Sequence, residues 1–335
     1  MIDTVAIVGA GAWGTALAVH LAGVPAPPAL RLWARDPAAA RSIASARENS
    51  RYLPGIALPP QIDVVSELSD ATEGASLVVV ATPVGALTGI VQALHAHTRA
   101  PLVWLCKGFV AATDPPGIAL PHRVVAPMWP ASVAVISGPS FAEEVARGLP
   151  TAVSVAATES ELARSIAQRL RGGSLRAYVS DDLTGTEVGG AVKNVLAIAA
   201  GASDGLGFGD NARAALITRG LAETGRLAVA LGGRRETLTG LAGLGDLVLT
   251  CTGDLSRNRR VGLGLGRGGA LAAILSVLGH VAEGVFAAQA AHTLAGALGV
   301  DMPICEAVYR VLYEDLPPRR AVEALLAREP GAEFQ

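Results

Sequence analysis

The two lysines of this chain are its strongest candidates for acid–base chemistry. Of 27 basic residues only Lys107 and Lys193 are lysines, and all the others are arginines. An ammonium group can release its proton when it loses water, whereas a guanidinium stays charged. Lys193 lies among small and apolar residues, where a lysine is costly to bury unless it is paired or neutralised. It is therefore a candidate for proton transfer, and the alternative is a lysine that extends to the surface.

Polar residues further along the chain could complete such a site. Asp246 is an acid in an apolar, glycine-rich stretch, and Ser256, Arg257 and Asn258 open a basic cluster that ends at Arg260. A hydroxyl, a guanidinium fork and an amide together suit a phosphate group. A solvated helix end would have the same composition, so the spacing alone leaves both interpretations open.

A glycine-rich turn near the N-terminus indicates a nucleotide site. The segment Gly9-Ala10-Gly11-Ala12-Trp13-Gly14 directly follows an expected strand and opens an expected helix. In dinucleotide-binding turns the first glycine permits the tight turn, the second lets the backbone approach the pyrophosphate, and the third allows close helix–strand packing. A bare match to this pattern is weak, but here the strand, the helix and the N-terminal position agree.

The end of the second expected strand bears on the choice of dinucleotide. An NAD enzyme usually has an acid there to hold the ribose 2′-hydroxyl, whereas an arginine can pair with the 2′-phosphate of NADP. Arg35 directly follows this strand, and Asp36 comes next. We therefore expect NADP(H) to be preferred and NAD(H) to be usable. The alternative is that Arg35 is a solvated loop residue and Asp36 is the ribose ligand.

Short β-branched runs alternate with alanine-rich stretches in the first part of the chain. The runs are continuously apolar, as in strands that helices cover on both faces. This order predicts a Rossmann-type α/β domain over residues 1–180, with a doubly wound, mostly parallel sheet. The expected strands are 4–9, 29–34, 76–81, 101–105, 133–137, 152–156 and 175–179, and the expected helices are 12–22, 37–47, 84–95 and 159–170.

From residue 181 onward the sequence predicts an all-helical domain that extends to residue 335. Aspartates at 181 and 182 can cap a helix start, and no convincing strand follows. The expected helices are 183–203, 212–231, 243–250, 270–278, 285–298 and 304–314. A second glycine-rich stretch, residues 262–268, has no strand before it, so we interpret it as a flexible lid or linker.

The composition excludes several other classes of protein. Of the 335 residues, 51% are hydrophobic and 17% are charged, which argues against a disordered chain. The net charge of −2 gives no reason to expect nucleic acid or an anionic membrane as partner. An uncharged stretch, residues 4–30, is long enough to span a bilayer, but its glycines and prolines favour a strand, a turn and a helix. Three widely spaced cysteines fit a reduced, cytoplasmic chain.

Several short motifs occur in a fixed order over nearly the whole length. They are the glycine turn, Tyr52-Leu53-Pro54-Gly55, Lys107-Gly108, Ser137-Gly138-Pro139-Ser140-Phe141-Ala142, residues 187–194, residues 241–246, Ser256-Arg257-Asn258 and Val281-Ala282-Glu283-Gly284. Together they resemble those of the bacterial NAD(P)-dependent glycerol-3-phosphate dehydrogenases. Ala12 stands where a serine is frequent in that family, and Cys106 replaces the threonine or serine usual before Lys107. Both positions contribute backbone more than side chain.

The resemblance implies an activity and a set of site residues. The family interconverts sn-glycerol 3-phosphate and dihydroxyacetone phosphate by hydride transfer and supplies glycerophospholipid synthesis. Lys193 matches the family's proton acceptor, Lys107 a second positive charge, and Asp246 the group that orients Lys193. The implied substrate contacts are Lys107, Gly138, Ser140, Lys193, Asn194, Asp246, Thr250, Ser256, Arg257 and Asn258. The implied cofactor contacts, beside Gly9, Gly11 and Gly14, are Ala12, Trp13, Arg35, Lys107, Ala142, Arg257, Val281 and Glu283. A homodimer is also implied, and no metal site is expected.

Two other classes of protein would share part of this pattern. Another two-domain enzyme, such as a β-hydroxyacid dehydrogenase or a ketopantoate reductase, would also have the glycine turn and a lysine-bearing helix. It would not need Ser256, Arg257 and Asn258 for a phosphate. A non-enzymatic nucleotide-sensing module would have no use for a buried lysine beside an acid.

Overall fold

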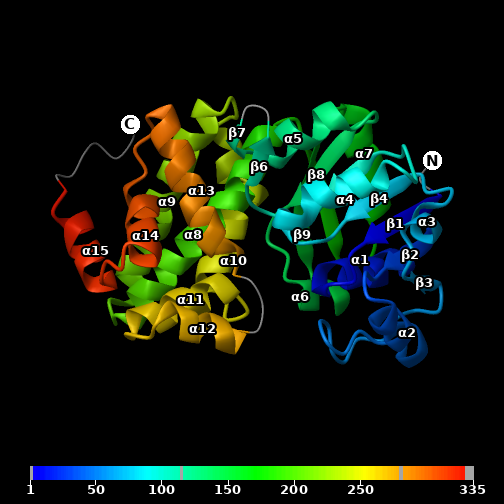
Figure 1. Cartoon of the computed structure of the whole chain (residues 1–335), viewed down its shortest axis with the longest axis horizontal. Helices are drawn as coiled ribbons and strands as arrows, with labels where there is room; N and C mark the ends of the chain where they lie inside the picture. The colour runs from blue at the N-terminus through cyan, green and yellow to red at the C-terminus, as the bar shows by residue number, and fades with distance from the viewer. Residues whose placement is uncertain (1–2, 114–115, 279–281, 329–335) are drawn as a thin grey trace.

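The computed structural model describes residues 3–113, 116–278 and 282–328. A sheet with helices packed on it forms one half of the molecule, and a bundle of helices forms the other (Figure 1). The sheet runs in the order β10-β9-β8-β5-β4-β1-β2-β3, and all neighbours are parallel except β8 and β9. Its strands are β1 (Thr4–Val8), β2 (Ala29–Trp33), β3 (Ile62–Val65), β4 (Leu77–Val80), β5 (Leu102–Trp104), β8 (Val133–Ser137), β9 (Thr151–Ala157) and β10 (Leu175–Ser180).

Helices cover both faces of this sheet. Successive side chains of a strand point to opposite sides, so a strand that is covered on both sides contributes to two cores. Val5 and Ile7 of β1 belong to one hydrophobic core, and Ala6 and Val8 belong to another. Helices α1 (Ala12–Ala22), α2 (Pro37–Ala46) and α7 (Ser160–Leu170) contribute to the first core, and α3 (Leu68–Thr72), α4 (Leu87–Leu94) and α5 (Pro121–Met128) to the second. The predicted Rossmann-type, mostly parallel sheet is confirmed.

The strand prediction missed three short strands. β3 forms the edge of the sheet, and β6 (Val110–Thr113) pairs with β7 (Pro116–Ala119) in a separate antiparallel hairpin. Their sequences are only four residues long, and β3 includes an exposed aspartate, Asp63. They therefore lack the continuous apolar run on which the prediction depended. Two helical elements are also short: helix α6 (Ala142–Ala146), which was not predicted, and the 3₁₀ turn Val84–Ala86, which lies at the start of the predicted helix 84–95.

The second half contains helices and, within its described residues, no strand, as predicted. Helix α8 (Leu183–Gly205) begins shortly after β10, and the predicted domain boundary at 180/181 lies in their connection. It is buried along most of its length and forms the centre of the bundle (Figure 1). The helices around it are α9 (Gly209–Ala230), α10 (Asp246–Thr252), α11 (Arg257–Gly266), α12 (Leu271–Leu278), α13 (Glu283–Leu298), α14 (Pro303–Tyr313) and α15 (Pro318–Leu326).

The prediction of a flexible lid or linker at residues 262–268 was wrong. Most of this stretch belongs to helix α11, which packs directly on α8. A Cβ on Gly262 would lie 1.9 Å from the carbonyl oxygen of Ile198, and one on Gly201 would lie 2.0 Å from that of Arg259. Only glycine permits this approach, so these residues bring two helix backbones into contact instead of loosening the chain.

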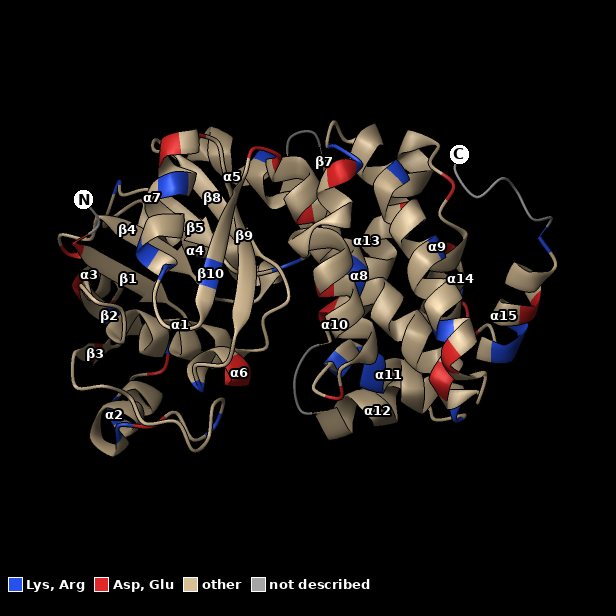
Figure 2. Ribbon diagram, turned by 180° about the vertical axis from the view of Figure 1, so that it is seen from behind, with Lys and Arg blue, Asp and Glu red and all other residues tan. Residues whose placement is uncertain are grey.

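The distribution of charge in the structure fits the near-neutral net charge of the sequence. Basic and acidic residues are interspersed over both halves in Figure 2. Among the helices of the described ranges, none has the combined length and apolarity that crossing a membrane requires.

Candidate active site

The glycine turn has the geometry that a dinucleotide pyrophosphate requires. Gly9 has φ +124°, and a Cβ there would lie 2.9 Å from the carbonyl group of Ala81. A Cβ on Gly14 would lie 2.0 Å from the Gly9 oxygen, whereas a Cβ on Gly11 would meet only the Ala81 oxygen, at 4.0 Å. Gly11 is the N-cap residue of α1. Because it has no side chain to accept from the first N–H groups of the helix, these groups remain for an anion. The turn therefore fits the cofactor that the sequence predicts.

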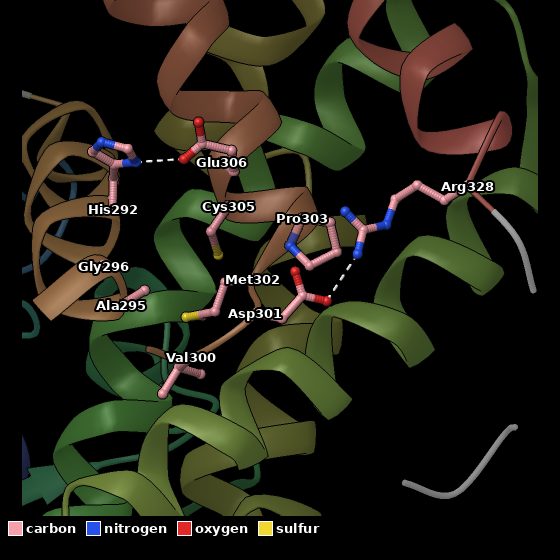
Figure 3. A pocket seen from close by; sticks show the side chains of 10 residues that line it. All are labelled: His292, Ala295, Gly296, Val300, Asp301, Met302, Pro303, Cys305, Glu306 and Arg328. Atoms are coloured by element: carbon pink, nitrogen blue, oxygen red, sulfur yellow. Dashed lines mark hydrogen bonds and ion pairs between the residues drawn. The ribbon is translucent and has the colours of Figure 1, made fainter. Parts of the chain in front are cut away.

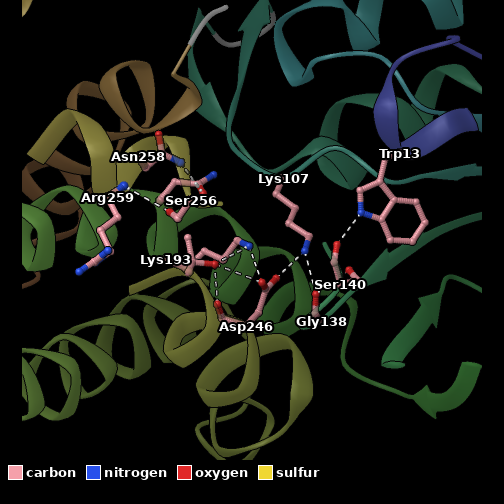
Figure 4. A network of polar contacts seen from close by, with 11 residues as sticks. Trp13, Lys107, Gly138, Ser140, Lys193, Asp246, Ser256, Asn258 and Arg259 are labelled. Carbon is pink, nitrogen blue, oxygen red and sulfur yellow. Dashed lines mark hydrogen bonds and ion pairs between the residues drawn. The ribbon is translucent and has the colours of Figure 1, made fainter. Parts of the chain in front are cut away.

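A carboxylate joins the two lysines at the junction of the two halves (Figure 4). Lys193 Nζ donates to Asp246 Oδ1 and, at 3.0 Å, to Thr250 Oγ1. Lys107 Nζ donates to Asp246 Oδ2 at 2.5 Å and to the Gly138 oxygen at 3.0 Å. Asp246 is 1% exposed and Lys193 is 8% exposed. The structure thus brings together three residues that lie far apart in the sequence.

Burial and charge set the protonation of this cluster. Burial, together with the nearby charge of Lys107, lowers the pKa of Lys193 to about 8, although the carboxylate of Asp246 opposes the shift. Burial alone would raise the pKa of Asp246, but the two ammonium groups outweigh it and hold that pKa below its usual value. The cluster therefore holds a carboxylate beside an ammonium that can exchange its proton near neutral pH.

Backbone packing explains why Asp246 reaches Lys193. A π-helical turn, Leu241–Gly245, directly precedes Asp246. A Cβ on Gly189 of α8 would lie 2.4 Å from the Ala242 oxygen, so this glycine lets the turn lie against the helix. Gly189 is one turn before Lys193, and helical side chains lean toward the N-terminus. The small residues beside Lys193 thus place the acid next to the lysine, and π turns often occur at functional sites.

The sheet side of the site is formed by loops that follow β5 and β8. Lys107 lies just after β5, while Gly138 and Ser140 follow β8. Ser140 Oγ donates to the Gly138 oxygen at 2.9 Å. Trp13 Nε1 donates to the Ser140 oxygen at 2.8 Å, which ties the start of α1 to this loop (Figure 4). The predicted Ala142 begins α6 in the same segment.

The predicted phosphate-binding residues lie at the N-terminus of α11. Ser256 caps the helix, its Oγ accepting from the Arg259 N–H at 3.2 Å. Arg257 is exposed. Asn258 is buried, and its Nδ2 donates to Asn194 Oδ1 of α8 at 2.9 Å. A helix N-terminus with an exposed arginine offers N–H donors and positive charge to an anion.

The remaining predicted cofactor contacts lie on both sides of the junction. Arg35 is exposed after β2, whereas Asp36 Oδ1 accepts from the Ala38 N–H at 3.0 Å and caps α2. Glu283 begins α13, and burial raises its pKa, although the charges of Arg257 and the two lysines oppose this. Val281 lies outside the described residues.

Two hydroxyls at the same edge of the sheet received no role from the sequence, although Ser137 opens one of the family motifs. Thr82 Oγ1 and Ser137 Oγ are buried without a hydrogen-bond partner in the described part of the chain. Thr82 follows β4 beside Gly9, and Ser137 ends β8 beside Gly190 and the Lys107 side chain. A buried hydroxyl without a partner costs free energy, so both fit a site that a ligand completes. Their positions at the carboxyl ends of strands are the signal that could have found them.

A cavity of about 210 Å³ lies away from this cluster, between α13 and α14 (Figure 3). The polar side chains that line it are already paired: His292 with Glu306, and Arg328 with Asp301. It therefore offers less chemistry than the junction of the two halves.

A glycine turn that fits a pyrophosphate, on a mostly parallel sheet beside a helical domain with a buried lysine–aspartate pair, is typical of a two-domain NAD(P)-dependent dehydrogenase. Within that class, the chain belongs to the NAD-dependent glycerol-3-phosphate dehydrogenase family. The family's N-terminal model matches residues 4–163, and its C-terminal model matches residues 182–323.

Individual relatives agree with this assignment. The chain is 52% identical over 332 residues to the glycerol-3-phosphate dehydrogenase [NAD(P)+] of Nitrosomonas eutropha, covering 98% of this chain and 99% of the relative. It is 53% identical over 333 residues to that of Aromatoleum aromaticum, with the same coverage. The crystal structure of the Coxiella burnetii glycerol-3-phosphate dehydrogenase matches with a TM-score of 0.91 at 43% identity, over 98% of this chain and 99% of that one.

Proposed function

We propose that this enzyme interconverts sn-glycerol 3-phosphate and dihydroxyacetone phosphate. The observation that carries the proposal is the buried Lys193–Asp246 pair at the junction of a dinucleotide-binding sheet and a helical domain. When bound, the reduced nicotinamide supplies the hydride that reduces the substrate carbonyl at C2. The residues of this chain then have to bind the phosphate, hold the carbonyl and provide the proton.

Lys193 is the proposed acid in the direction of reduction. Negative charge develops on the C2 oxygen as the carbonyl is reduced, and the Lys193 ammonium donates its proton to that oxygen. In the direction of oxidation neutral Lys193 accepts the proton of the hydroxyl. Asp246 and Thr250 fix the Nζ atom through their hydrogen bonds, and Lys107 adds a second positive charge beside the developing oxyanion.

The substrate phosphate is proposed to bind at the start of α11. Ser256, Arg257 and Asn258 combine helix N–H groups with an exposed guanidinium, which suits a dianion. The other proposed substrate contacts are Asn194, which follows Lys193 on α8, and Gly138 and Ser140 on the side of Lys107. Neither a hydroxyacid dehydrogenase nor a nucleotide sensor requires this anion site, and this favours the phosphorylated substrate.

The proposed cofactor residues are the glycine turn with Ala12 and Trp13, then Arg35, Lys107, Ala142, Arg257, Val281 and Glu283. The names of the relatives include NAD(P)+, which supports the use of both dinucleotides. The preference for NADP(H) rests on Arg35. One carboxylate oxygen of Asp36 accepts from the Ala38 N–H, which gives this residue a capping role at α2.

The test is a comparison of two carbonyl substrates that differ only in the phosphate. Purified enzyme is expected to oxidise NADPH, and to a smaller extent NADH, with dihydroxyacetone phosphate, and to leave dihydroxyacetone almost untouched. Nicotinamide absorbance at equal concentrations of the two cofactors measures this. Comparable rates with both carbonyl substrates would contradict the assignment.

We also propose that the enzyme acts in the cytoplasm as a homodimer and supplies glycerophospholipid synthesis. The buried, unbridged thiols of Cys106, Cys251 and Cys305 support a reducing compartment. The dimer rests on the family resemblance. Light scattering coupled to size exclusion would give the mass of one chain if the dimer is absent.

A further inference from the structure

A buried asparagine contacts the glycine turn from a distant segment. Asn49 lies between α2 and β3 and is 1% exposed. Its Nδ2 donates to the Ala10 oxygen at 2.9 Å and to Thr15 Oγ1 at 2.8 Å. Ala10 lies between the first two glycines of the turn, and Thr15, fully buried, lies in the first turn of α1. One amide group therefore braces both the turn and the start of the helix behind it.

The backbone holds this amide in place independently of its side chain. The Asn49 oxygen accepts from the Leu53 N–H at 2.8 Å and from the Tyr52 N–H at 3.2 Å. Leu53 is buried and belongs to the same hydrophobic core as Ala10. The motif Tyr52-Leu53-Pro54-Gly55, which the proposed reaction leaves unused, thus anchors the residue that contacts the glycine turn.

The electronic effect of these bonds bears on anion binding. A donor on the Ala10 carbonyl polarises the peptide unit whose N–H belongs to Gly11, because hydrogen bonds in a chain strengthen one another. It also engages lone pairs of the Ala10 oxygen, which would otherwise repel an anion near the turn. Asn49 does both without adding a charge of its own.

We propose that Asn49 is a positioning residue for the cofactor, which holds the glycine turn in its anion-binding form. It acts on the pyrophosphate shared by NADP(H) and NAD(H) and not on the 2′-phosphate that tells them apart. The inference rests on the proposed function only in that the chain binds such a dinucleotide.

The experiment is a calorimetric titration of the purified full-length chain with NADP⁺ and, separately, with NAD⁺, without substrate. Asn49→Asp keeps the shape but replaces both donors with acceptors. We expect it to raise the Kd for both dinucleotides by about 10- to 100-fold, the range for losing buried hydrogen bonds. Arg35→Ala is the matched contrast, because it should raise the Kd for NADP⁺ much more than that for NAD⁺.

Three further readouts separate positioning from simple stability. Protonation of the new carboxyl at Asn49→Asp restores a donor, so the ratio of variant to wild-type Kd should fall as the pH is lowered from 8 toward 6. Thr15→Val removes one acceptor of the Asn49 amide and should weaken both dinucleotides, whereas Thr15→Ser keeps the hydroxyl and should bind like the wild type. Turnover of Asn49→Asp at saturating cofactor should stay at the wild-type level.

A wild-type Kd in Asn49→Asp, or a loss confined to NADP⁺, would overturn the inference. So would a lowered melting temperature with unchanged Kd, which would make Asn49 structural only. If Asn49→Asp does not fold, the Thr15→Val and Thr15→Ser pair decides, since equal affinity in both overturns the inference. A chain that binds dinucleotide but does not reduce dihydroxyacetone phosphate would count against the proposed function and leave this inference standing.

Discussion

Lys193 and Lys107 approach the same carboxylate from the two halves of the molecule, and their surroundings differ. Lys193 projects from α8, the helix at the centre of the bundle, and Thr250 adds a second fixed contact. Lys107 follows the short strand β5, and its other contact is a backbone oxygen, that of Gly138. Its side chain is 14% exposed, against 10% for Lys193.

The two lysines share one carboxylate partner, so the difference between them comes from the helix or loop that carries each side chain. A lysine fixed in a packed helix is held at one place and desolvated, and this lowers the pKa of Lys193 to about 8. Lys107 lies in the loop that follows β5, where its Nζ contacts Asp246 and the Gly138 oxygen and, among the residues that the structure describes, has no hydroxyl contact like that of Lys193 with Thr250. This difference supports the proposed roles, proton transfer for Lys193 and charge stabilisation for Lys107.

The largest expected effect comes from replacing Lys193. Arginine keeps the positive charge but cannot exchange a proton at working pH. Lys193→Arg and Lys193→Ala should therefore both lose about 10²- to 10⁴-fold in rate, measured as steady-state turnover of dihydroxyacetone phosphate. Cofactor affinity, measured by titration, should survive in both because the glycine turn lies in the other half. Near wild-type turnover in Lys193→Arg would mean that Lys193 contributes only positive charge. The proposed difference in role between the two lysines would then not hold.

Removing their shared partner should have a smaller effect. Asp246→Asn leaves Lys193 in place but takes away the carboxylate that raises its pKa. We expect a loss of about 10- to 100-fold, the range for one charge-assisted hydrogen bond. The pKa seen in the rate profile for reduction should also move lower, because Lys107 and burial then act on Lys193 unopposed. An unshifted profile would mean that another group titrates.

In the unmodified enzyme the two directions of reaction should respond oppositely to pH. Reduction needs protonated Lys193, so its kcat/KM should be flat below the pKa of about 8 and fall above it. Oxidation of glycerol 3-phosphate needs the neutral amine, so its kcat/KM should rise through the same region. The limiting slope is about tenfold per pH unit for one proton. Profiles that bend in the same direction would exclude Lys193 as the titrating group.

The sheet and the central lysine could be predicted because each leaves a local signal. Continuous apolar runs indicated strands buried on both faces, and a lone lysine in an apolar stretch indicated a costly burial. The shared contact on Asp246 could not be predicted in this way. It depends on a π turn, Leu241–Gly245, and on the close approach of Gly189 to Ala242, which no periodicity reveals.

The two glycine-rich stretches show the same limit more sharply. In residues 9–14 the backbone at Gly11 is open to a ligand, whereas at Gly262 and Gly266 it lies against carbonyl oxygens of α8. The two sequences are similarly rich in glycine. Which atoms a Cβ at each glycine would contact depends on residues far away in the sequence. The preceding strand identified the first stretch correctly, but the absence of a strand did not make the second one a linker.

The smallest expected effect comes from Lys107→Arg, and it tests the comparison most directly. If Lys107 supplies only positive charge, a guanidinium can replace it, and kcat for reduction should fall by less than about tenfold. Lys107→Gln, which has a polar side chain but no charge, should lose more. Measured beside Lys193→Arg with the same substrate and cofactor, the pair separates charge from proton transfer, because each lysine receives the same substitution. A loss in Lys107→Arg as large as that in Lys193→Arg would mean that the site needs an ammonium at both positions, and the division of roles between the two halves would not hold.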